Sequence, residues 1–313
     1  MKKIQKILIL IPAYNEEKNL LYVIPKIPKK IAGIERDILV VDDGSSDRTS
    51  EIAENLGCRV VKHIKNSGVG KAFNTGVNYA IDNKYDLMVT MDADGQFDAN
   101  EISKLVKPIL KGKAQFVTGT RFSNRRRHKN HLKDIGNKFF TNITNRITGK
   151  RFTDTQCGFR AYSREALLRL NIMGDFTYTQ EVFIDLAYKD IKMLEVPITV
   201  RNRINGKSRV ANNVWSYGMR ASKIIIRAFR DYKPLSFFGI PAITISFIGF
   251  LLMLFSLVYY LIYFRTTPVR MLIYLGAFLF IFGVILMMIA LVADMFVRQR
   301  KMQEEILYRL RKK

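Results

Sequence analysis

Two aspartates at the end of an apolar run have the types and spacing of a site for a hard divalent cation. Leu87–Met91 is typical of a buried strand, and Asp92 and Asp94 follow it directly. Side chains at alternate positions of an extended chain point to the same side. Carboxylate oxygens suit a hard divalent cation, and Gln96 adds a neutral oxygen two residues later. We expect these three side chains to hold a cation that could neutralise a diphosphate.

A second apolar run also ends in carboxylates. Ile38–Val41 is followed by Asp42 and Asp43, and then by the loop Gly44–Asp47. The carboxyl ends of parallel strands meet at one edge of a sheet, which is where open α/β folds bind ligands. We therefore expect the two acidic clusters to lie together at one ligand-binding edge.

Strands and helices alternate in the segment that must position these acids. The expected strands are 4–11, 38–41, 59–61, 87–91 and 116–118. The expected helices are 17–30, interrupted by Pro25, 47–56, with Asp47 as its N-cap, 70–82, and one that begins at Asp98. Such alternation is typical of a mostly parallel sheet with helices on both faces. The sequence therefore predicts an α/β fold.

Positive charge is concentrated in two segments. The chain has 51 Lys and Arg residues against 27 Asp and Glu residues, a net charge of +24. Arg121–Arg151 holds ten basic residues and one acidic residue, and Arg201–Lys233 holds nine and one. Charge confined in this way indicates a local anionic partner. Nucleic acid, phospholipid and a phosphorylated substrate are all consistent with this charge distribution.

The last third of the chain contains two long runs without a charged residue. Pro234–Phe264 has 31 residues and Met271–Ala293 has 23. About 20 apolar residues cross a bilayer, so we predict transmembrane helices at about 235–264 and 271–294. The short link between them makes a hairpin whose outer ends share one side. Basic residues beside those ends predict a two-span cell-membrane protein with a cytoplasmic N-terminal domain.

Four segments follow from these patterns. They are an α/β domain at 1–211, an amphipathic interfacial helix at 212–233, the hairpin at 234–297, and a basic cytoplasmic tail at 298–313. The interfacial helix is expected because basic residues and an apolar stripe lie on adjoining faces, which suits contact with anionic membrane lipid. The oligomeric state does not follow from the sequence.

The cysteines and the amino terminus indicate where the chain resides. Cys58 and Cys157 lack the spacing of metal ligands or of a disulfide framework, which favours a reducing compartment. The apolar run at the start is short and continues directly into Pro12–Glu17. We expect a first buried strand there rather than a signal peptide.

Seven short motifs follow one another in a specific order. They are Pro12–Glu17 (PAYNEE), Asp42–Asp47 (DDGSSD), Asp92–Gln96 (DADGQ), Gly119–Arg121 (GTR), Asp154–Arg160 (DTQCGFR), Glu195–Ile198 (EVPI) and Asn205–Ser208 (NGKS). With this set the chain resembles the polyprenyl-phosphate glycosyltransferases of glycosyltransferase family 2, which include dolichyl-phosphate mannose and glucose synthases. The resemblance covers roughly residues 7–209. It implies a GT-A fold, a nucleotide-binding α/β domain, for residues 1–211.

The resemblance also implies roles for the matching residues. The donor, a nucleotide diphosphate sugar, would be held by Pro12, Tyr14, Glu16, Asp43, Asp92, Arg203 and Lys207, with Asp42 supporting the loop. Mg²⁺ or Mn²⁺ would be held by Asp92, Asp94 and Gln96, of which Asp94 is the surest ligand. Arg121 would hold the acceptor phosphate, with Lys133 as the second candidate for this role. Glu181 lies where relatives place acids at the sugar end.

The implied reaction is transfer of a hexose or N-acetylhexosamine, with inversion, to polyprenyl or dolichyl phosphate. The bond from the anomeric carbon to the nucleotide diphosphate breaks through a cation-like transition state, and a metal ion stabilises the departing diphosphate. A phosphate monoester with a second pKa of about 6 is already ionised at pH 7 and needs no general base. It needs cations, which the segment beginning at Arg121 offers.

Two other functions stay open on the sequence. The chain could glycosylate a hydroxyl lipid such as diacylglycerol, in which case Glu181 would act as a general base. It could instead be a non-catalytic membrane-tethered scaffold whose basic surface binds nucleic acid or lipid. The intact acidic clusters argue against this and against a nucleic-acid partner, because carboxylates at the ligand edge would repel nucleic-acid phosphates. The sugar, the nucleotide of the donor and the polyprenol do not follow from the sequence.

Overall fold

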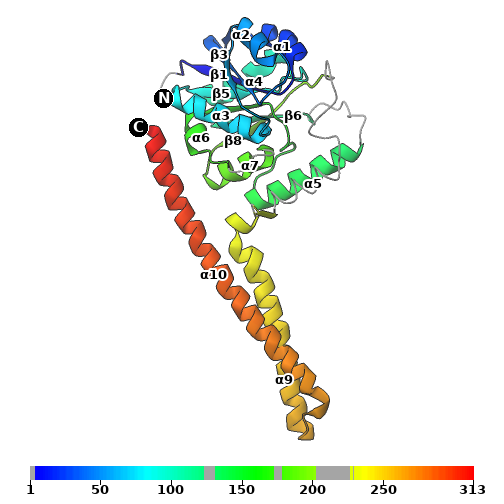
Figure 1. Ribbon diagram of the computed structural model, residues 1–313. Coiled ribbons are helices and arrows are strands. Elements are labelled where there is room, and N and C mark those ends of the chain that lie inside the picture. The colour runs from blue at the N-terminus through cyan, green and yellow to red at the C-terminus, as the bar shows by residue number, and fades with distance from the viewer. Residues whose placement is uncertain (1–3, 123–130, 173–177, 202–225, 228) are drawn as a thin grey trace. The chain divides into compact units, whose positions relative to one another are not determined.

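Two compact units make up the chain. The computed structural model describes residues 4–122, 131–172, 178–201, 226–227 and 229–313 (Figure 1). One unit comprises Met1–Ile225 together with Tyr308–Lys313, and the other comprises Ile226–Leu307.

The first unit is built on an eight-stranded mixed sheet. Its strands are β1 (Ile7–Ala13), β2 (Lys30–Ile31), β3 (Ile34–Asp42), β4 (Arg59–Lys62), β5 (Leu87–Thr90), β6 (Phe116–Thr120), β7 (Arg160–Ser163) and β8 (Met193–Pro197). They are ordered β2-β3-β1-β5-β7-β6-β8, and β4 pairs with β3. Strand β1 lies between β3 and β5, parallel to both. Strand β7 runs antiparallel between β5 and β6.

Helices cover both faces of this sheet (Figure 1). They are α1 (Glu17–Val23), α2 (Thr49–Asn55), α3 (Val69–Asp82), α4 (Ile102–Leu110), α5 (His131–Thr148), α6 (Arg164–Arg169) and α7 (Thr179–Tyr188), with short 3₁₀ turns η1 (Ile24–Lys26) and η2 (Ala99–Glu101). Alternate residues of β1 enter different cores, because side chains of a strand alternate between its faces. Ile9 packs in the core that holds residues of α1, α2 and α4, whereas Leu10 packs in the core that holds residues of α3, α6 and α7. The predicted α/β fold with two covered faces is confirmed.

Several elements differ from the sequence prediction. Strands β2, β7 and β8 were not among the expected strands, and β7 and the short β2 make the sheet mixed. The helix expected at 17–30 ends as α1 at Val23 and continues only as the turn η1, which contains Pro25. The helix expected from Asp47 begins at Thr49, whose backbone N–H donates to the Asp47 carboxylate at 3.0 Å. Asp98 accepts a hydrogen bond from the backbone of Asn100 and thus caps η2, which precedes α4.

The second unit contains two helices long and apolar enough to cross a membrane. Helix α9 (Ile240–Tyr263) follows a π-helical turn, η3 (Leu235–Gly239), and a 3₁₀ turn, η4 (Thr267–Val269), leads into α10 (Arg270–Lys312). The apolar windows of the two helical stretches have mean hydropathies of 2.4 and 2.9 and are only 11% and 17% buried. The expected span at 271–294 falls within the second stretch, Thr267–Lys312, and the one at 235–264 matches the first, Leu235–Tyr263, except for Phe264. Most of the interfacial helix expected at 212–233 lies outside the described residues.

Glycines let the two apolar helices approach at backbone contact. A Cβ atom added to Gly249 of α9 would lie 2.5 Å from the backbone nitrogen of Phe280 in α10. One added to Gly283 of α10 would lie 2.7 Å from the backbone nitrogen of Ser246 in α9. Close approach through small residues is how apolar helices associate where lipid removes the hydrophobic driving force.

Helix α10 continues beyond its apolar part through the segment predicted as a tail. Its last residues, from Tyr308 onward, belong to the first unit. The hydroxyl of Tyr308 donates to the carboxylate of Glu165 in α6 at 3.0 Å, and Arg311 donates to the carbonyl of Leu170 at 2.8 Å. The carboxyl terminus is therefore attached to the same unit as the amino terminus.

Candidate active site

The acidic ends of β3 and β5 lie at one edge of the sheet. Both strands are parallel to β1, which separates them, so the loops that follow all three strands emerge together. Asp42 and Asp43 stand at the end of β3, and Asp92 and Asp94 follow β5. The structure thus brings together the two acidic clusters that were found separately in the sequence.

The loop after β5 fixes the two aspartates differently. Asp94 is 4% exposed, and its carboxylate accepts a hydrogen bond from the backbone of Gln96 at 3.0 Å. Gly95, between them, has a positive φ of 72°, which a glycine adopts without strain. Asp92 lies against Gly158, where an added Cβ would stand 3.1 Å from both carboxylate oxygens. Gly158 therefore leaves the room that the Asp92 carboxylate occupies.

This loop suits a cation that takes some of its ligands from a substrate. Within the described part of the chain, no group of three or more His, Cys, Asp or Glu side chains could hold a metal ion. Two aspartates and the Gln96 amide supply hard oxygen atoms. Mg²⁺ in phosphate-transfer and nucleotide sites is commonly bound by one or two carboxylates, with substrate phosphates and water completing its shell. The residues present fit such an ion.

The loops after β1 and β3 are joined into one surface. Ser45 accepts from the backbone of Asn15 at 2.8 Å, and the Asn15 side chain accepts from the backbone of Ser46 at 2.8 Å. The hydroxyl of Thr49 accepts from the backbone of Glu16 at 2.9 Å. Three residues of this surface, Pro12, Tyr14 and Glu16, are the predicted donor-binding residues, and all three are half-buried.

The two aspartates at the end of β3 play different parts. Asp42 accepts hydrogen bonds from the backbone of Ser45 and from the hydroxyl of Ser50, so it supports its own loop. Asp43 contacts the imidazole of His63 at 2.7 Å and accepts from the backbones of Ser67 and Gly68. Asp43 therefore links the end of β3 to the loop before α3.

His63 is a site residue that the sequence reading missed. Its other ring nitrogen lies 2.9 Å from the hydroxyl of Thr75 in α3, so the imidazole bridges Asp43 and that helix. The side chain is only 14% exposed. The sequence carries no signal for this contact, because a lone histidine after a short strand has no defined partner until the chain folds.

Arg121, at the end of β6, forms a bidentate ion pair with Asp154. Its Nε and Nη2 atoms donate to the two carboxylate oxygens at 2.6 and 2.9 Å. Asp154 is fully buried and accepts further hydrogen bonds from the Asn137 side chain in α5 and the backbone of Gln156. Such parallel bonds fix the plane of the guanidinium as well as its position.

Charge and burial act in opposite directions on this pair. Burial alone would lower the pKa of Arg121, but the hydrogen bonds and charge of Asp154, with smaller effects of Cys157 and Asp92, raise it. Burial alone would raise the pKa of Asp154, but the hydrogen bonds and charge of Arg121 hold it below its usual value. Both groups are therefore ionised at neutral pH.

Glu195 in β8 holds the segment that contains Asp154. Its carboxylate accepts hydrogen bonds from the backbone and hydroxyl of Thr153, each at 2.9 Å, and from the backbone of Asp154 at 2.9 Å. Burial raises the pKa of Glu195, and these hydrogen bonds oppose the shift. The motif that begins at Glu195 is visible in the sequence, but its neighbouring residues do not indicate a role. In the structure Glu195 supports Arg121 through Asp154.

A buried arginine shapes the rest of the same loop. Arg160 is fully buried and donates to the carbonyls of Cys157 and Thr155 at 2.7 and 3.0 Å. Its guanidinium also lies 4.8 Å from the ring centroid of Phe183. These contacts hold the turn that presents Gly158 to Asp92.

The amino-terminal end of α7 approaches the same place. Tyr178, which precedes α7, stacks on Phe73 with ring centroids 4.0 Å apart. Burial raises the pKa of Tyr178, and the negative charge of Asp92 raises it further. The guanidinium of Arg160, which holds the turn at Gly158, lies 5.6 Å from the centroid of the Tyr178 ring. Glu181, in the first turn of α7, is half-buried.

Three predicted site residues are not described in full. Lys133 belongs to α5, but its side chain lies outside the described residues, and Arg203 and Lys207 lie outside them altogether. Their proposed roles therefore remain predictions.

Comparison with known proteins decides the family. The model of the family described as Glycosyl transferase family 2 matches residues 8–170, which hold both acidic clusters and the Arg121–Asp154 pair. The chain belongs to glycosyltransferase family 2. It is therefore a glycosyltransferase, as its sequence motifs predicted.

Curated relatives of this glycosyltransferase include proteins named for polyprenyl phosphates. The chain is 35% identical over 229 residues to the uncharacterized protein MJ1222 of Methanocaldococcus jannaschii, covering 72% of this chain and 93% of that protein. It is 35% identical to the UDP-N-acetylglucosamine–dolichyl-phosphate N-acetylglucosaminyltransferase of Methanococcus voltae, covering 51% and 70%. It is 28% identical to the polyprenol monophosphomannose synthase of Mycolicibacterium smegmatis, covering 67% and 82%.

Solved structures establish the fold. Glucosyl-3-phosphoglycerate synthase from Mycobacterium tuberculosis, in complex with Mn²⁺, uridine diphosphate and phosphoglyceric acid, is similar with a TM-score of 0.57. The two chains are 20% identical over 72% of this chain and 78% of that one. The same synthase has also been solved with Mg²⁺ and uridine diphosphate. The first unit has the GT-A fold, which the motifs predicted.

The Asp154–Arg121 pair generates a prediction about stability and pH. Asp154→Asn should lower the free energy of unfolding by about 3 kcal/mol at pH 7, because it leaves a largely buried guanidinium without its counter-charge. The folded-state pKa of Asp154 is depressed, so its stabilising effect is present above about pH 4 and lost as the pH falls through the folded pKa. The difference between variant and wild type, measured by thermal unfolding of the detergent-solubilised protein, should therefore shrink below pH 4.

Asp185→Asn is the matched control. Asp185, in α7, is equally buried and pairs with Lys189 at 2.8 Å. Both variants should lose stability, but only Asp154→Asn should lower sugar transfer measured at a temperature where both are folded. Equal transfer activities in the two variants would contradict the role assigned to Asp154.

Proposed function

We propose that this glycosyltransferase moves a hexose or N-acetylhexosamine, with inversion, from a nucleotide diphosphate sugar to a polyprenyl phosphate such as dolichyl phosphate. The product would supply glycoconjugate synthesis or protein glycosylation. The observation that carries the proposal is a fixed, charged guanidinium, Arg121, whose partner Asp154 lies in the same segment as Gly158, against which the Asp92 carboxylate of the ligand edge packs. The names of the M. voltae and M. smegmatis relatives support the acceptor class.

The donor nucleoside would lie on the surface formed by the loops after β1 and β3. Pro12, Tyr14 and Glu16 would contact the base and ribose, together with Asp43. A carboxylate has about four acceptor positions, and His63, Ser67 and Gly68 occupy three of those of Asp43. The remaining position could accept an N–H of the base.

Mg²⁺ or Mn²⁺ would be held by Asp92, Asp94 and Gln96. When bound, the ion would act as a Lewis acid that stabilises charge on the departing diphosphate. The chain itself contributes a prepared carboxylate, because the backbone of Gln96 orients Asp94. Arg203 and Lys207 would add positive charge to the donor phosphates.

The acceptor phosphate would be held by Arg121, with Lys133 as a second cation. The Nε and Nη2 atoms of Arg121 are engaged by Asp154, and its Nη1 atom takes no part in that pair. The pair therefore orients the arginine without using all its donors. A phosphate acceptor is already ionised at pH 7, so Glu181 would act on the sugar and not as a base. A hydroxyl lipid would instead require Glu181 to take a proton.

The protein would be a cell-membrane protein with two spans and a cytoplasmic catalytic unit. The attachment of Tyr308 and Arg311 to the first unit supports this topology, because both outer ends of the hairpin must then share one side. Lys233, before the first span, and Arg298 and Lys301, after the second apolar run, favour the cytoplasmic side. Membrane lipid would surround the exposed apolar side chains of α9 and α10.

The metal site is tested by removing one charge. Asp94→Asn should lower transfer roughly a hundredfold or more, because the ligand loses its charge without changing shape. EDTA should abolish wild-type transfer, and added Mn²⁺ or Mg²⁺ should restore it. Asp86→Asn, at the opposite end of β5, is the control and should transfer normally. Full wild-type activity in excess EDTA would exclude the metal-dependent mechanism.

The acceptor is tested with a panel of lipids. Purified enzyme and radiolabelled nucleotide sugars should label dolichyl or undecaprenyl phosphate, but neither the dephosphorylated polyprenol nor diacylglycerol. Loss of one charge-assisted contact to phosphate costs about 1.5–3 kcal/mol, so Arg121→Ala should raise the KM for polyprenyl phosphate roughly ten- to a hundredfold. The KM for the donor should change little. Equal transfer to the polyprenol would favour the hydroxyl-lipid function.

The topology is tested with reporters. A reporter fused after Lys313 should behave as cytoplasmic, and one inserted at Thr266, between the spans, as external. Protease protection with the opposite pattern would contradict the assignment, because the catalytic unit would then lack access to cytosolic nucleotide sugar.

A further inference from the structure

The loop that carries Asp94 is paired with the segment after β8. Phe97 and Val200 form an isolated antiparallel bridge. The backbone N–H of Arg201 donates to the carbonyl of Gln96 at 2.8 Å. The loop thus gains a short partner strand from a part of the chain about 100 residues away, although it belongs to no strand of the main sheet.

Side chains extend this pairing in antiparallel order. Arg201 donates from Nη2 to the Asp98 carboxylate at 2.6 Å. Two residues earlier, the backbone and hydroxyl of Thr199 donate to the Glu101 carboxylate at 2.7 and 3.1 Å. Glu101 is only 8% exposed and also pairs with Lys104 at 2.6 Å. Three consecutive residues, 199–201, therefore attach to the loop and to the turn η2 behind it.

The pairing reaches Asp94 through a single residue. Gln96 donates its backbone N–H to the Asp94 carboxylate and receives the Arg201 N–H on its carbonyl. Both backbone groups of Gln96 are thereby fixed. On the other side of the loop, Phe97 stacks on Phe159 with centroids 5.0 Å apart. The conformation that orients Asp94 is therefore held from two directions.

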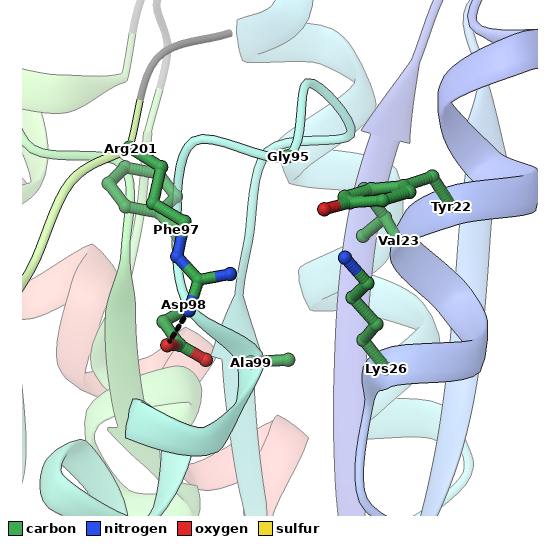
Figure 2. Close-up of a pocket in the computed structure, with 8 residues that line it drawn as sticks. All are labelled: Tyr22, Val23, Lys26, Gly95, Phe97, Asp98, Ala99 and Arg201. Carbon is green, nitrogen blue, oxygen red and sulfur yellow. Dashed lines mark hydrogen bonds and ion pairs between the residues drawn. The ribbon is translucent and has the colours of Figure 1, made fainter. Parts of the chain in front are cut away.

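The ion pair lies at a solvent-accessible pocket. Figure 2 shows Arg201 and Asp98 on one side of it, and Tyr22 and Lys26, from α1 and η1, on the other. The Arg201 side chain is 54% exposed and that of Asp98 20%. An ion pair with this exposure adds little to global stability. Its main effect should be on the local order of the loop that carries Asp94.

We propose that Arg201 is a positioning residue that orders the Asp94 loop before the metal ion and diphosphate bind. The inference rests on the proposed role of Asp94 as a metal ligand. Without the Arg201–Asp98 contact, the loop would have to become ordered when the ion binds. The entropy lost in this ordering would weaken the affinity for the ion. The ion would then be needed at higher concentration, whereas turnover at saturating metal would stay near that of the wild type.

Hydrogen exchange on the full-length protein in detergent tests the ordering directly. In metal-free buffer, Arg201→Gln should speed amide exchange in peptides that cover residues 92–98 by about twofold to fivefold, the upper part of the range expected for one exposed ion pair. Asp98→Asn should have the same effect, because it removes the charge that pairs with Arg201. The asparagine can still accept the hydrogen bond that caps η2, so this cap is not lost. Arg201→Lys, which keeps the charge, should restore part of the protection.

Metal titration tests the consequence. The Mn²⁺ concentration for half-maximal transfer should rise about twofold to fivefold in Arg201→Gln, with little change in kcat at saturating Mn²⁺. Arg59→Gln is the matched control, because Arg59 is an exposed arginine of β4 that contacts the hydroxyl of Tyr79. It should behave as the wild type in both measurements.

The outcomes separate this inference from the proposed function. Wild-type exchange rates at 92–98 in Arg201→Gln would overturn the ordering role, whatever the activity. Faster exchange with an unchanged Mn²⁺ requirement would overturn its link to the metal. If wild-type transfer proved independent of metal, the metal-dependent function would fail together with this link, and the exchange rates would still show whether Arg201 orders the loop.

Discussion

The buried ion pair between Arg121 and Asp154 is the contact on which the rest of the site depends. It joins the end of β6 to the loop before β7, and Asn137 adds α5 to the same carboxylate. Glu195 of β8 then holds the backbone of that loop. Four segments that are distant in sequence are thereby fixed around one guanidinium. Removing either charge would leave the other buried and unpaired, which costs several kcal/mol.

The site combines the Arg121 guanidinium with carboxylates that would otherwise repel both substrates. The acids after β3 and β5 face the same edge of the sheet, and a diphosphate or a lipid phosphate would meet their negative charge there. A metal ion at Asp94 and the guanidinium of Arg121 would supply the compensating positive charge. In the proposed reaction, the ion would stabilise the charge on the departing diphosphate, and Arg121 would bind the attacking phosphate.

Local patterns predicted much of the fold and some of the site. Apolar runs identified β1, β3 and β5, and the acids at their ends identified the edge where ligands bind. Helix α1 was predicted too long because Pro25 allows only a 3₁₀ turn after Val23. Strand β7 was missed because it has only four residues, and its pairing with β5 and β6 depends on strands more than 40 residues earlier in the chain.

The sequence by itself determined the family motifs, the acidic strand ends and the two apolar runs, because each is a pattern within one continuous stretch of the chain. Only the tertiary structure decided which side chains meet. Arg121 pairs with Asp154 across a sequence separation of 33 residues, and His63 contacts Asp43 across 20 residues. Arg201 pairs with Asp98 across 103 residues. These contacts form between single polar groups, and a single charge in a sequence does not specify its partner. The partner is selected by burial and by the strand order that brings the two groups together.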